Sequence, residues 1–255
     1  MMSQFRGLLM KDWTIIKGYV LLVLLLDIII PLGSAMLFPF ESFLGLLVYS
    51  GTVMLLHTLV PIVLLSILFT KEMDHPDIFF HSSASIHKIN ASKFGIVFLA
   101  TALSLLWTSL LTFVSMLFAP DLIEMENLLP FGAAFVAVIL FFSVLVAIVY
   151  YFYLTLFYTM KPKIGSFAYI VTFGLFIFGL EMWDRVMATK LYIAATDFWV
   201  IRLDKSEFLT NIAHGLMLSF ENRATLQVGQ LLVTALLLVF LYLLTAYWFE
   251  KKVRA

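Results

Sequence analysis

The sequence predicts an all-α integral membrane protein with six transmembrane helices. Hydrophobic residues fill 63% of its 255 positions and charged residues only 13%, whereas soluble domains carry about 25% charge. Six apolar stretches are each long enough to cross a bilayer, which takes about 20 helical residues. Helices are expected because an open strand would leave backbone groups unsatisfied in lipid. The predicted spans are Gly18–Phe38, Leu44–Phe69, Phe94–Phe118, Phe131–Tyr158, Ile164–Leu180 and Gly229–Phe249.

The basic residues of the short loops predict how these spans are oriented. Lys and Arg collect in the short cytoplasmic loops of membrane proteins. A cytoplasmic N-terminus places every short-loop Lys and Arg inside and leaves only acids in the two short outer loops. We therefore expect a multi-pass plasma-membrane protein with both termini in the cytoplasm. The inner basic residues are Arg6, Lys11, Lys17, Lys71, Lys88, Lys93, Lys161, Lys163, Lys251, Lys252 and Arg254, and the outer acids are Glu41, Asp121, Glu124 and Glu126.

Residues 1–17 predict an amphipathic helix ahead of the first span. Their apolar side chains recur at helical spacing, and polar residues such as Lys11 fall on another face. This pattern is typical of a helix that lies in the membrane interface, here the inner one. The alternative is that the segment prolongs the first span into the cytoplasm. Residues 18–255 are then a single six-helix transmembrane domain.

Residues 181–228 form the large outer segment of the predicted topology. Charged residues alternate there with apolar ones such as Trp183, Tyr192 and Phe198. This mixture favours short amphipathic helices that rest on the outer leaflet. The preceding span, Ile164–Leu180, is short and contains three glycines. We expect that span to be broken, tilted or closely packed against a neighbour.

The inner loop at residues 71–93 combines acidic, aromatic and polar residues. Acids and a proline at the start of a short helix favour its N-terminus, and two phenylalanines follow them. Aromatic side chains commonly anchor small protein contacts, so one interpretation is a docking helix for a partner protein. The other is a solvated loop whose phenylalanines rest on the membrane. The candidate docking residues are Glu72, Asp74, Asp77, Ile78, Phe79, Phe80, Ser83 and Lys88.

Two ionisable residues lie inside predicted spans, each four positions before a proline. Asp27 precedes Pro31, and His57 precedes Pro61. Proline lacks the N–H that would bond to the carbonyl four residues earlier, and a charge at mid-span costs about 2.5–3.5 kcal/mol on insertion scales. One interpretation is that Asp27 and His57 line or gate a polar path, as a pair. The other is that Asp27 is protonated or hydrogen-bonded within the bundle and that His57 caps a kink carbonyl.

A cluster of tyrosines lies at the inner end of the fourth span. It includes Tyr150 and Tyr153. An aromatic belt at the membrane interface explains such a cluster, and a substrate-facing wall of the path is the alternative interpretation.

Known catalytic and metal-binding motifs are missing from the sequence. It lacks cysteine, the phosphate-binding G-x-x-x-x-G-K-[ST] motif and the zinc-binding H-E-x-x-H motif. The five histidines do not have metal-ligand spacing. The formal net charge is zero and no basic stripe is present, so no nucleic acid partner is indicated. We expect no catalytic residue, metal or cofactor on this chain.

The overall layout resembles a type-2 ABC transporter permease subunit of bacterial exporters. The shared features are the amphipathic N-terminal segment, six spans, a Glu-containing loop after the second span and a larger outer element before the last. In that family the inner loop runs from an acidic start through an apolar stretch to a Leu-Pro-Val-Ser-Arg pattern and a Lys that opens the third span. The similar stretches here are Ile78–Phe80, Ser83–Lys88, Lys93 and the charged ending Phe249–Lys252, without the Pro and Arg of the pattern.

The resemblance implies a transport subunit without enzymatic activity of its own. ATP and Mg²⁺ would be bound by a separate ABC ATPase that docks on the 71–93 loop, and a second permease copy or a sister permease would complete the path. The apolar spans favour an amphipathic peptide or a lipid-like substrate over an ion. Two rival functions remain at this point. They are a membrane-embedded enzyme and a non-transporting scaffold or immunity component.

Overall fold

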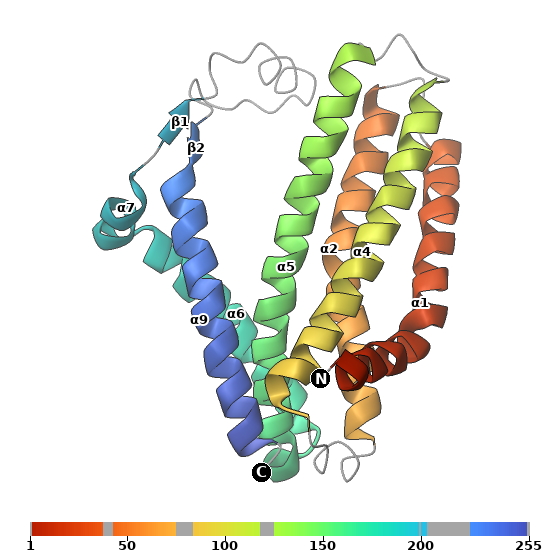
Figure 1. Cartoon of the computed structure of the whole chain (residues 1–255). Coiled ribbons are helices and arrows are strands. Elements are labelled where there is room, and N and C mark those ends of the chain that lie inside the picture. The colour runs from red at the N-terminus through yellow and green to blue at the C-terminus, as the bar shows by residue number, and fades with distance from the viewer. Residues whose placement is uncertain are drawn as a thin grey trace. The chain divides into compact units, whose positions relative to one another are not determined.

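The computed structural model describes residues 2–37, 43–74, 84–117, 125–198, 200–202 and 225–253 (Figure 1). Six of the described helices are long and apolar enough to cross a membrane. The chain is therefore a multi-pass helical membrane protein, and the described residues of the six predicted spans are helical, except that the fifth span begins at Phe167 after a turn at Gly165 and Ser166. The elements are α1 (Met2–Leu37), α2 (Phe43–Met73), α4 (Ile86–Leu117), α5 (Met125–Ile164), α6 (Phe167–Met187), α7 (Lys190–Thr196), β1 (Val200–Arg202), β2 (Thr225–Gln227) and α9 (Val228–Lys252).

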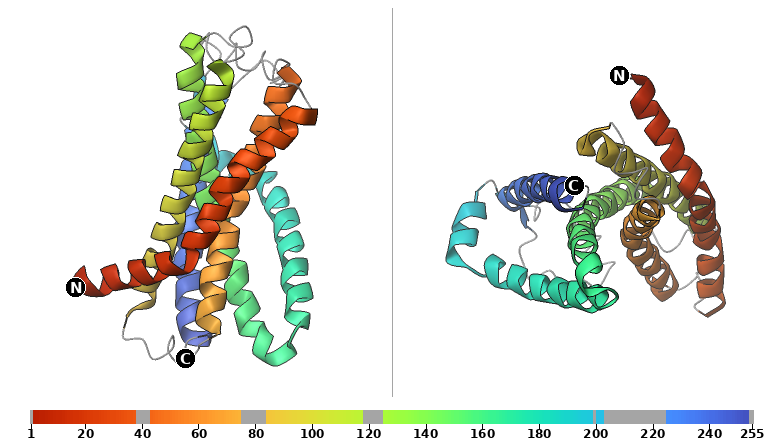
Figure 2. Two further views of the ribbon diagram at one scale, coloured as in Figure 1. Left: turned by 90° about the vertical axis from the view of Figure 1, so that its right-hand side faces the viewer. Right: turned by 90° about the horizontal axis from the view of Figure 1, so that it is seen from below.

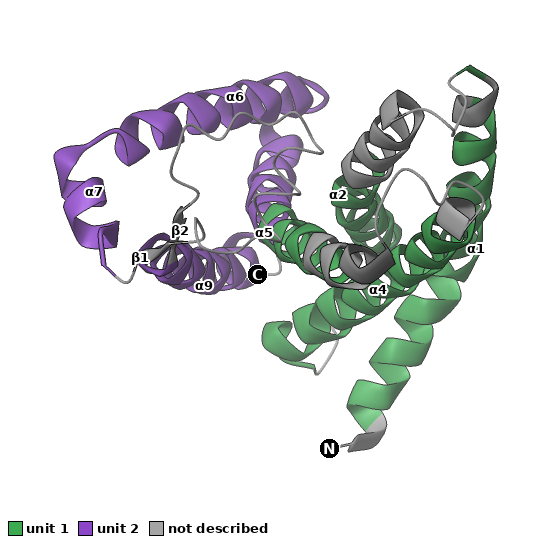
Figure 3. Cartoon of the chain, turned by 90° about the horizontal axis from the view of Figure 1, so that it is seen from above, with its two compact units in different colours: residues 1–147 green, residues 148–255 purple. Residues whose placement is uncertain are grey.

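The chain divides into two compact units, Met1–Ala147 and Ile148–Ala255 (Figure 3). The boundary falls inside α5. The first unit contains α1, α2, α4 and the first part of α5. The second contains the rest of α5 together with α6, α7, the two strands and α9.

In the first unit, α1, α2 and α4 pack against one another. Small and polar side chains of α4 face this packing, because Ala100, Thr101 and Ser104 are buried. Small residues let membrane helices approach closely. On the opposite face, Leu99 and Leu106 are exposed, as suits a surface that lipid covers. The helix thus buries its small face and exposes its large apolar one.

The N-terminal segment and the first span form one continuous helix. Figure 2 shows that the first turns of α1 lie crosswise to the rest of the helix. Among residues 2–17, Asp12 and Ile16 are buried, whereas Phe5 and Trp13 are exposed. An acidic side chain is therefore one of the groups by which this segment contacts the bundle.

In the second unit, α6 runs unbroken through its two glycines. The turn that precedes it contains Gly165 at φ +57°, a left-handed conformation that glycine adopts without strain. The hydroxyl of Tyr153 donates a 3.3 Å hydrogen bond to the carbonyl of Leu175. It lies against Gly179, where a Cβ would collide with it. Close packing, one of the three outcomes expected for this span, is therefore present at Gly179.

Residues 181–228, the predicted outer segment, contain the end of α6, a further helix, a pair of strands and the first residue of α9 in their described parts. The seven-residue α7 is followed by β1, which pairs with β2 in antiparallel register, Val200 with Gln227 and Arg202 with Thr225. The strands were not expected, because the alternation of charged and apolar residues was interpreted as helical. Val200, Ile201 and Thr225 are β-branched residues, which favour strands.

Candidate functional site

The first unit contains two buried polar clusters on the same three helices. We name them the ion cluster, formed by the buried Asp12, Glu72, Ser92 and Lys93 with the half-exposed Lys11, and the membrane cluster, formed by Asp27, His57, Ser104 and Thr108. On α1 and on α2 the two levels are roughly four helical turns apart, and on α4 about three. On each helix, the residues of the ion cluster and those of the membrane cluster therefore lie on about the same face, which is the face that contacts the neighbouring helices.

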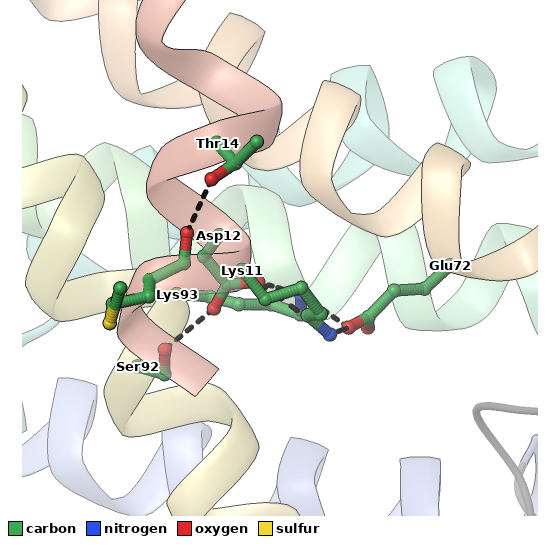
Figure 4. A network of polar contacts seen from close by, with 7 residues as sticks. Lys11, Asp12, Thr14, Glu72, Ser92 and Lys93 are labelled. Atoms are coloured by element: carbon green, nitrogen blue, oxygen red, sulfur yellow. Dashed lines mark hydrogen bonds and ion pairs between the residues drawn. The ribbon is translucent and has the colours of Figure 1, made fainter. Parts of the chain in front are cut away.

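Lys93 is the centre of the ion cluster (Figure 4). Its side chain is fully buried, and its Nζ lies 2.9 Å from Glu72 Oε1 and 3.4 Å from Asp12 Oδ1. The same ammonium group lies 5.2 Å from the centre of the Phe69 ring, a distance at which the ring face attracts a cation. Lys93 therefore joins α4 to both α1 and α2.

Two further side chains complete the ion cluster. Lys11 forms an ion pair with Glu72 and lies 3.7 Å from Asp12. Ser92 Oγ donates a 2.6 Å hydrogen bond to Asp12 Oδ2. Two ammonium groups thus balance two carboxylates. The second oxygen of Glu72 is buried and accepts no hydrogen bond among the described residues.

The position of the ion cluster gives it a mechanical consequence. The predicted 71–93 loop is shorter in the structure, because α2 continues to Met73 and α4 begins at Ile86. Glu72 lies in the last turn of α2 and Lys93 in the second turn of α4, so they flank the connection between these helices. Glu72 pairs with Lys11 and Lys93 pairs with Asp12, and both of these partners belong to the N-terminal part of α1. Breaking a buried ion pair leaves an uncompensated charge and costs about 3–5 kcal/mol. Ion pairs therefore anchor the loop to the N-terminal segment, and breaking them costs several kcal/mol of free energy.

The membrane cluster links the same helices within their apolar parts. Ser104 Oγ donates a 2.7 Å hydrogen bond to Asp27 Oδ2 and lies 2.9 Å from His57 Nε2. The Asp27 carboxylate and the His57 ring are 3.8 Å apart. Thr108 Oγ1 lies 3.4 Å from the same ring nitrogen. All four side chains are buried, so these polar groups solvate one another in place of water.

The carbonyl of His57 has a partner on α5. Pro61 has no N–H to bond to the carbonyl four residues earlier, which is that of His57. The hydroxyl of Ser143 approaches this oxygen at 3.4 Å and donates to it. The proline in α2 therefore makes a bonding site for a side chain of a neighbouring helix.

The membrane cluster is not arranged as a hydrolytic triad. In a triad the carboxylate binds one ring nitrogen of the histidine and the serine hydroxyl binds the other. Here Ser104 lies between the acid and the base, and Asp27 approaches the same Nε2 that contacts the serine. The serine proton is directed at Asp27, so the imidazole does not withdraw it. In the described parts of the chain no group of three metal-binding side chains is present.

The structure brings some of the predicted site residues together and separates others. Asp27 and His57 meet in the membrane cluster, and Pro31 and Pro61 lie within α1 and α2. Tyr150 and Tyr153 belong to the second unit. Glu72 is buried in the ion cluster. Asp74 is exposed and lies 3.9 Å from Lys71, and Lys88 donates a 3.4 Å hydrogen bond to Gln4. Asp77, Ile78, Phe79, Phe80 and Ser83 lie outside the described residues.

Sequence reasoning missed the polar residues that complete the clusters. Asp12 and Lys93 were assigned to no site, and Ser92, Ser104 and Thr108 were not singled out. A signal was present in α4, where Lys93, Val97, Ser104 and Thr108 recur at spacings that place them on one face. A helix face that carries a Lys and two hydroxyls inside a membrane span indicates packing against polar partners.

Comparison with known proteins provides no further assignment. No protein-family model matches the chain, and neither a curated protein nor a solved structure does.

Proposed function

We propose that this chain is the permease subunit of an ATP-driven ABC exporter. A separate ATPase, which carries ATP and Mg²⁺, binds the 71–93 loop, and a second permease copy or a sister permease completes the path. The substrate is an amphipathic or hydrophobic molecule of the peptide or lipid class. The apolar character of the spans favours such a substrate over an ion.

The observation that carries this proposal is the pairing of Lys93 with Glu72 and Asp12. The Glu72 and Lys93 ends of the loop are tied by buried ion pairs to each other and to the crosswise segment of α1. A force that a partner exerts on the loop is then passed to three helices together. A loop with loose ends would absorb the same displacement, so the cluster suits a coupling element.

The proposed orientation follows from the charge bias of the short loops. The crosswise segment of α1 lies in the cytoplasmic interface with Phe5 and Trp13 in contact with lipid, as amphipathic interfacial helices do. The segment that contains α7 and the strands lies outside the cell, and both termini lie in the cytoplasm of a bacterium. The protein then spans the plasma membrane six times.

Copurification tests the proposed partner. The full-length chain is tagged, expressed in its native host and extracted in mild detergent. We expect a P-loop ATPase to copurify and to hydrolyse ATP. The double variant Phe79→Ala/Phe80→Ala should lose it, while Ser109→Ala should keep it, because the Ser109 hydroxyl donates to the carbonyl of Leu105 in its own helix. A folded wild-type chain that never recovers an ATPase would refute the proposal.

Cysteine labelling tests the proposed orientation independently. The chain contains no cysteine, so a single introduced thiol reports one position. Met10, His87 and Leu191 are exposed. In intact cells an impermeant thiol reagent should label Leu191→Cys and should leave Met10→Cys and His87→Cys unlabelled until the membrane is opened. Labelling of His87→Cys in intact cells would contradict the proposed orientation and would place residue 87 outside the cell.

A further inference from the structure

The membrane cluster has no part in the proposed coupling to an ATPase, and its chemistry sets it apart from the rest of the spans. Asp27 is the sole ionisable acid or base among Asp, Glu, His, Lys and Arg in residues 18–37. His57 is likewise the sole such residue in residues 43–70, and residues 94–117 contain no Asp, Glu, His, Lys or Arg. On α5 the group that faces the cluster is the uncharged hydroxyl of Ser143. One acid and one base are thus paired in an otherwise uncharged environment.

The hydrogen bonds around His57 indicate where its proton lies. The Ser104 hydroxyl donates to Asp27 Oδ2, and the Thr108 hydroxyl donates to the backbone carbonyl of Ser104 at 2.9 Å. Both hydroxyl protons are therefore committed elsewhere. Both oxygens present lone pairs to His57 Nε2, at 2.9 and 3.4 Å. When Asp27 is ionised, Nε2 therefore carries a proton, which it donates mainly to Ser104.

Charge balance determines how many protons the pair retains. An ionised Asp27 beside a neutral imidazole would leave one net negative charge buried among apolar helices, and a protonated acid beside an imidazolium would leave one positive charge. Buried charges persist when they are paired. The pair is neutral when a single proton is added to the carboxylate and the neutral imidazole, on either partner.

We propose that Asp27, Ser104 and His57 form an intramembrane binding site for one transferable proton. In the first form His57 is an imidazolium and Asp27 a carboxylate. For transfer, the His57 Nε2–H bond breaks and its proton bonds to Ser104 Oγ, while the original hydroxyl proton of Ser104 bonds to Asp27 Oδ2. The imidazole is then neutral, Asp27 is a carboxylic acid and the serine hydroxyl is restored. The arrangement of heavy atoms serves both forms.

Proton transfer changes how strongly α1 and α2 attract each other. In the first form opposite charges face one another at 3.8 Å, in an environment where Coulomb attraction is poorly screened. In the second form both groups are neutral and only hydrogen bonds remain. The site therefore converts the position of one proton into a change in the contact between two helices.

Reciprocal substitutions test the proton count in the full-length chain in lipid nanodiscs. Nitrogen NMR of labelled histidine, assigned by the signal lost in His57→Gln, reports the charge of the ring. Infrared spectroscopy with labelled aspartate reports a protonated carboxyl group. We expect Asp27→Asn to remove the charge of the His57 ring and His57→Gln to place a proton on the Asp27 carboxyl group. A passive hydrogen bond would leave each remaining group in its original charge state.

The relay through Ser104 has its own variant and control. Ser104→Ala removes the bridging hydroxyl, and we expect exchange of the His57 ring proton with deuterated solvent to slow at least tenfold. Ser109 lies on the same helix, and Ser109→Ala should leave the exchange rate of the His57 ring proton unchanged. If Asp27 stays ionised in His57→Gln and His57 stays charged in Asp27→Asn, the site does not hold a shared proton. If Ser104→Ala exchanges as fast as the wild type, the relay is wrong. Should one variant fail to fold, the reciprocal variant decides the proton count.

Discussion

The Nζ of Lys93 lies 2.9 Å from Glu72 Oε1, and both side chains are buried. The two residues lie near opposite ends of the 71–93 loop, so this pair closes the loop at its base. Asp12 contacts the same ammonium group from α1. One lysine thus holds three helices together, and its removal leaves two carboxylates facing each other without a buried cation between them.

Replacing Lys93 should destabilise the protein strongly. Lys93→Met keeps a side chain of similar length but removes the buried one of the two ammonium groups that balance Glu72 and Asp12. We expect the free energy of unfolding to fall by about 3–5 kcal/mol, the usual cost of breaking a buried pair by removing one partner. Denaturant unfolding in detergent micelles measures the change.

An exposed ion pair provides the control for this variant. Arg185 and Glu181 are paired one turn apart on α6, and both side chains are more than half exposed. Such pairs contribute about 0.3–0.5 kcal/mol, so Arg185→Met should leave stability almost unchanged. If Lys93→Met and Arg185→Met lost equal stability, burial of the ion cluster would not explain the destabilisation by Lys93→Met.

The contact between Asp27 and His57 could be predicted from the sequence, whereas the serine between them could not. Two ionisable groups at similar depth in neighbouring apolar spans are each other's natural partners. The bridging group depends on how α4 is rotated. From the sequence alone, Ser104, Thr108 and Ser109 are equally plausible as the hydroxyl that bridges Asp27 and His57. The packing of α4 places Ser104 there, whereas the Ser109 hydroxyl donates to its own backbone.

The burial of Lys93 could not be predicted from loop charge. A lysine at the end of a membrane span usually extends its ammonium group into the interface, and the sequence placed Lys93 among the basic residues of the inner loops. Its actual environment depends on the crosswise turns of α1, which bring Asp12 to α4 (Figure 4). Residues far apart in sequence create this site. The six helices themselves could be predicted from the length of local apolar stretches.

Removing the hydroxyl of Ser92 should weaken the ion cluster without removing a charge. Its 2.6 Å hydrogen bond to Asp12 is buried and involves a charged acceptor, a class that contributes about 1.5–3 kcal/mol. We expect Ser92→Ala to lower the free energy of unfolding by that amount. Ser109→Ala serves as the control with a change below about 0.5 kcal/mol. Equal unfolding midpoints for wild type and Ser92→Ala would contradict the assignment.

The start of α7 depends on a side-chain cap. Thr189 Oγ1 accepts a 3.2 Å hydrogen bond from the backbone N–H of Tyr192, and loss of such a cap costs about 1 kcal/mol. Thr189→Ala should therefore speed hydrogen–deuterium exchange at the first amides of α7, whereas Thr189→Ser should not. Exchange that is equally fast in both variants would show that the hydroxyl has no capping role.

Gly229 should resist substitution because α9 begins against the end of α7. Its N–H donates a 3.2 Å hydrogen bond to the carbonyl of Phe198, and a Cβ at this position would collide with the backbone oxygens of Thr196 and Phe198. Backbone atoms cannot rotate away as side chains can, so Gly229→Ala must displace a helix end. Overpacking of this kind costs about 1–3 kcal/mol.

The matched control for this substitution is Gly174→Ala in the middle of α6. No atom lies within 4 Å of a Cβ built there, and alanine is favoured over glycine inside a helix by about 1 kcal/mol. Thermal unfolding in the same detergent should therefore give a lower midpoint for Gly229→Ala and an unchanged or higher one for Gly174→Ala. A tolerated Gly229→Ala would mean that α7 and the start of α9 do not approach as closely as their backbone hydrogen bond requires.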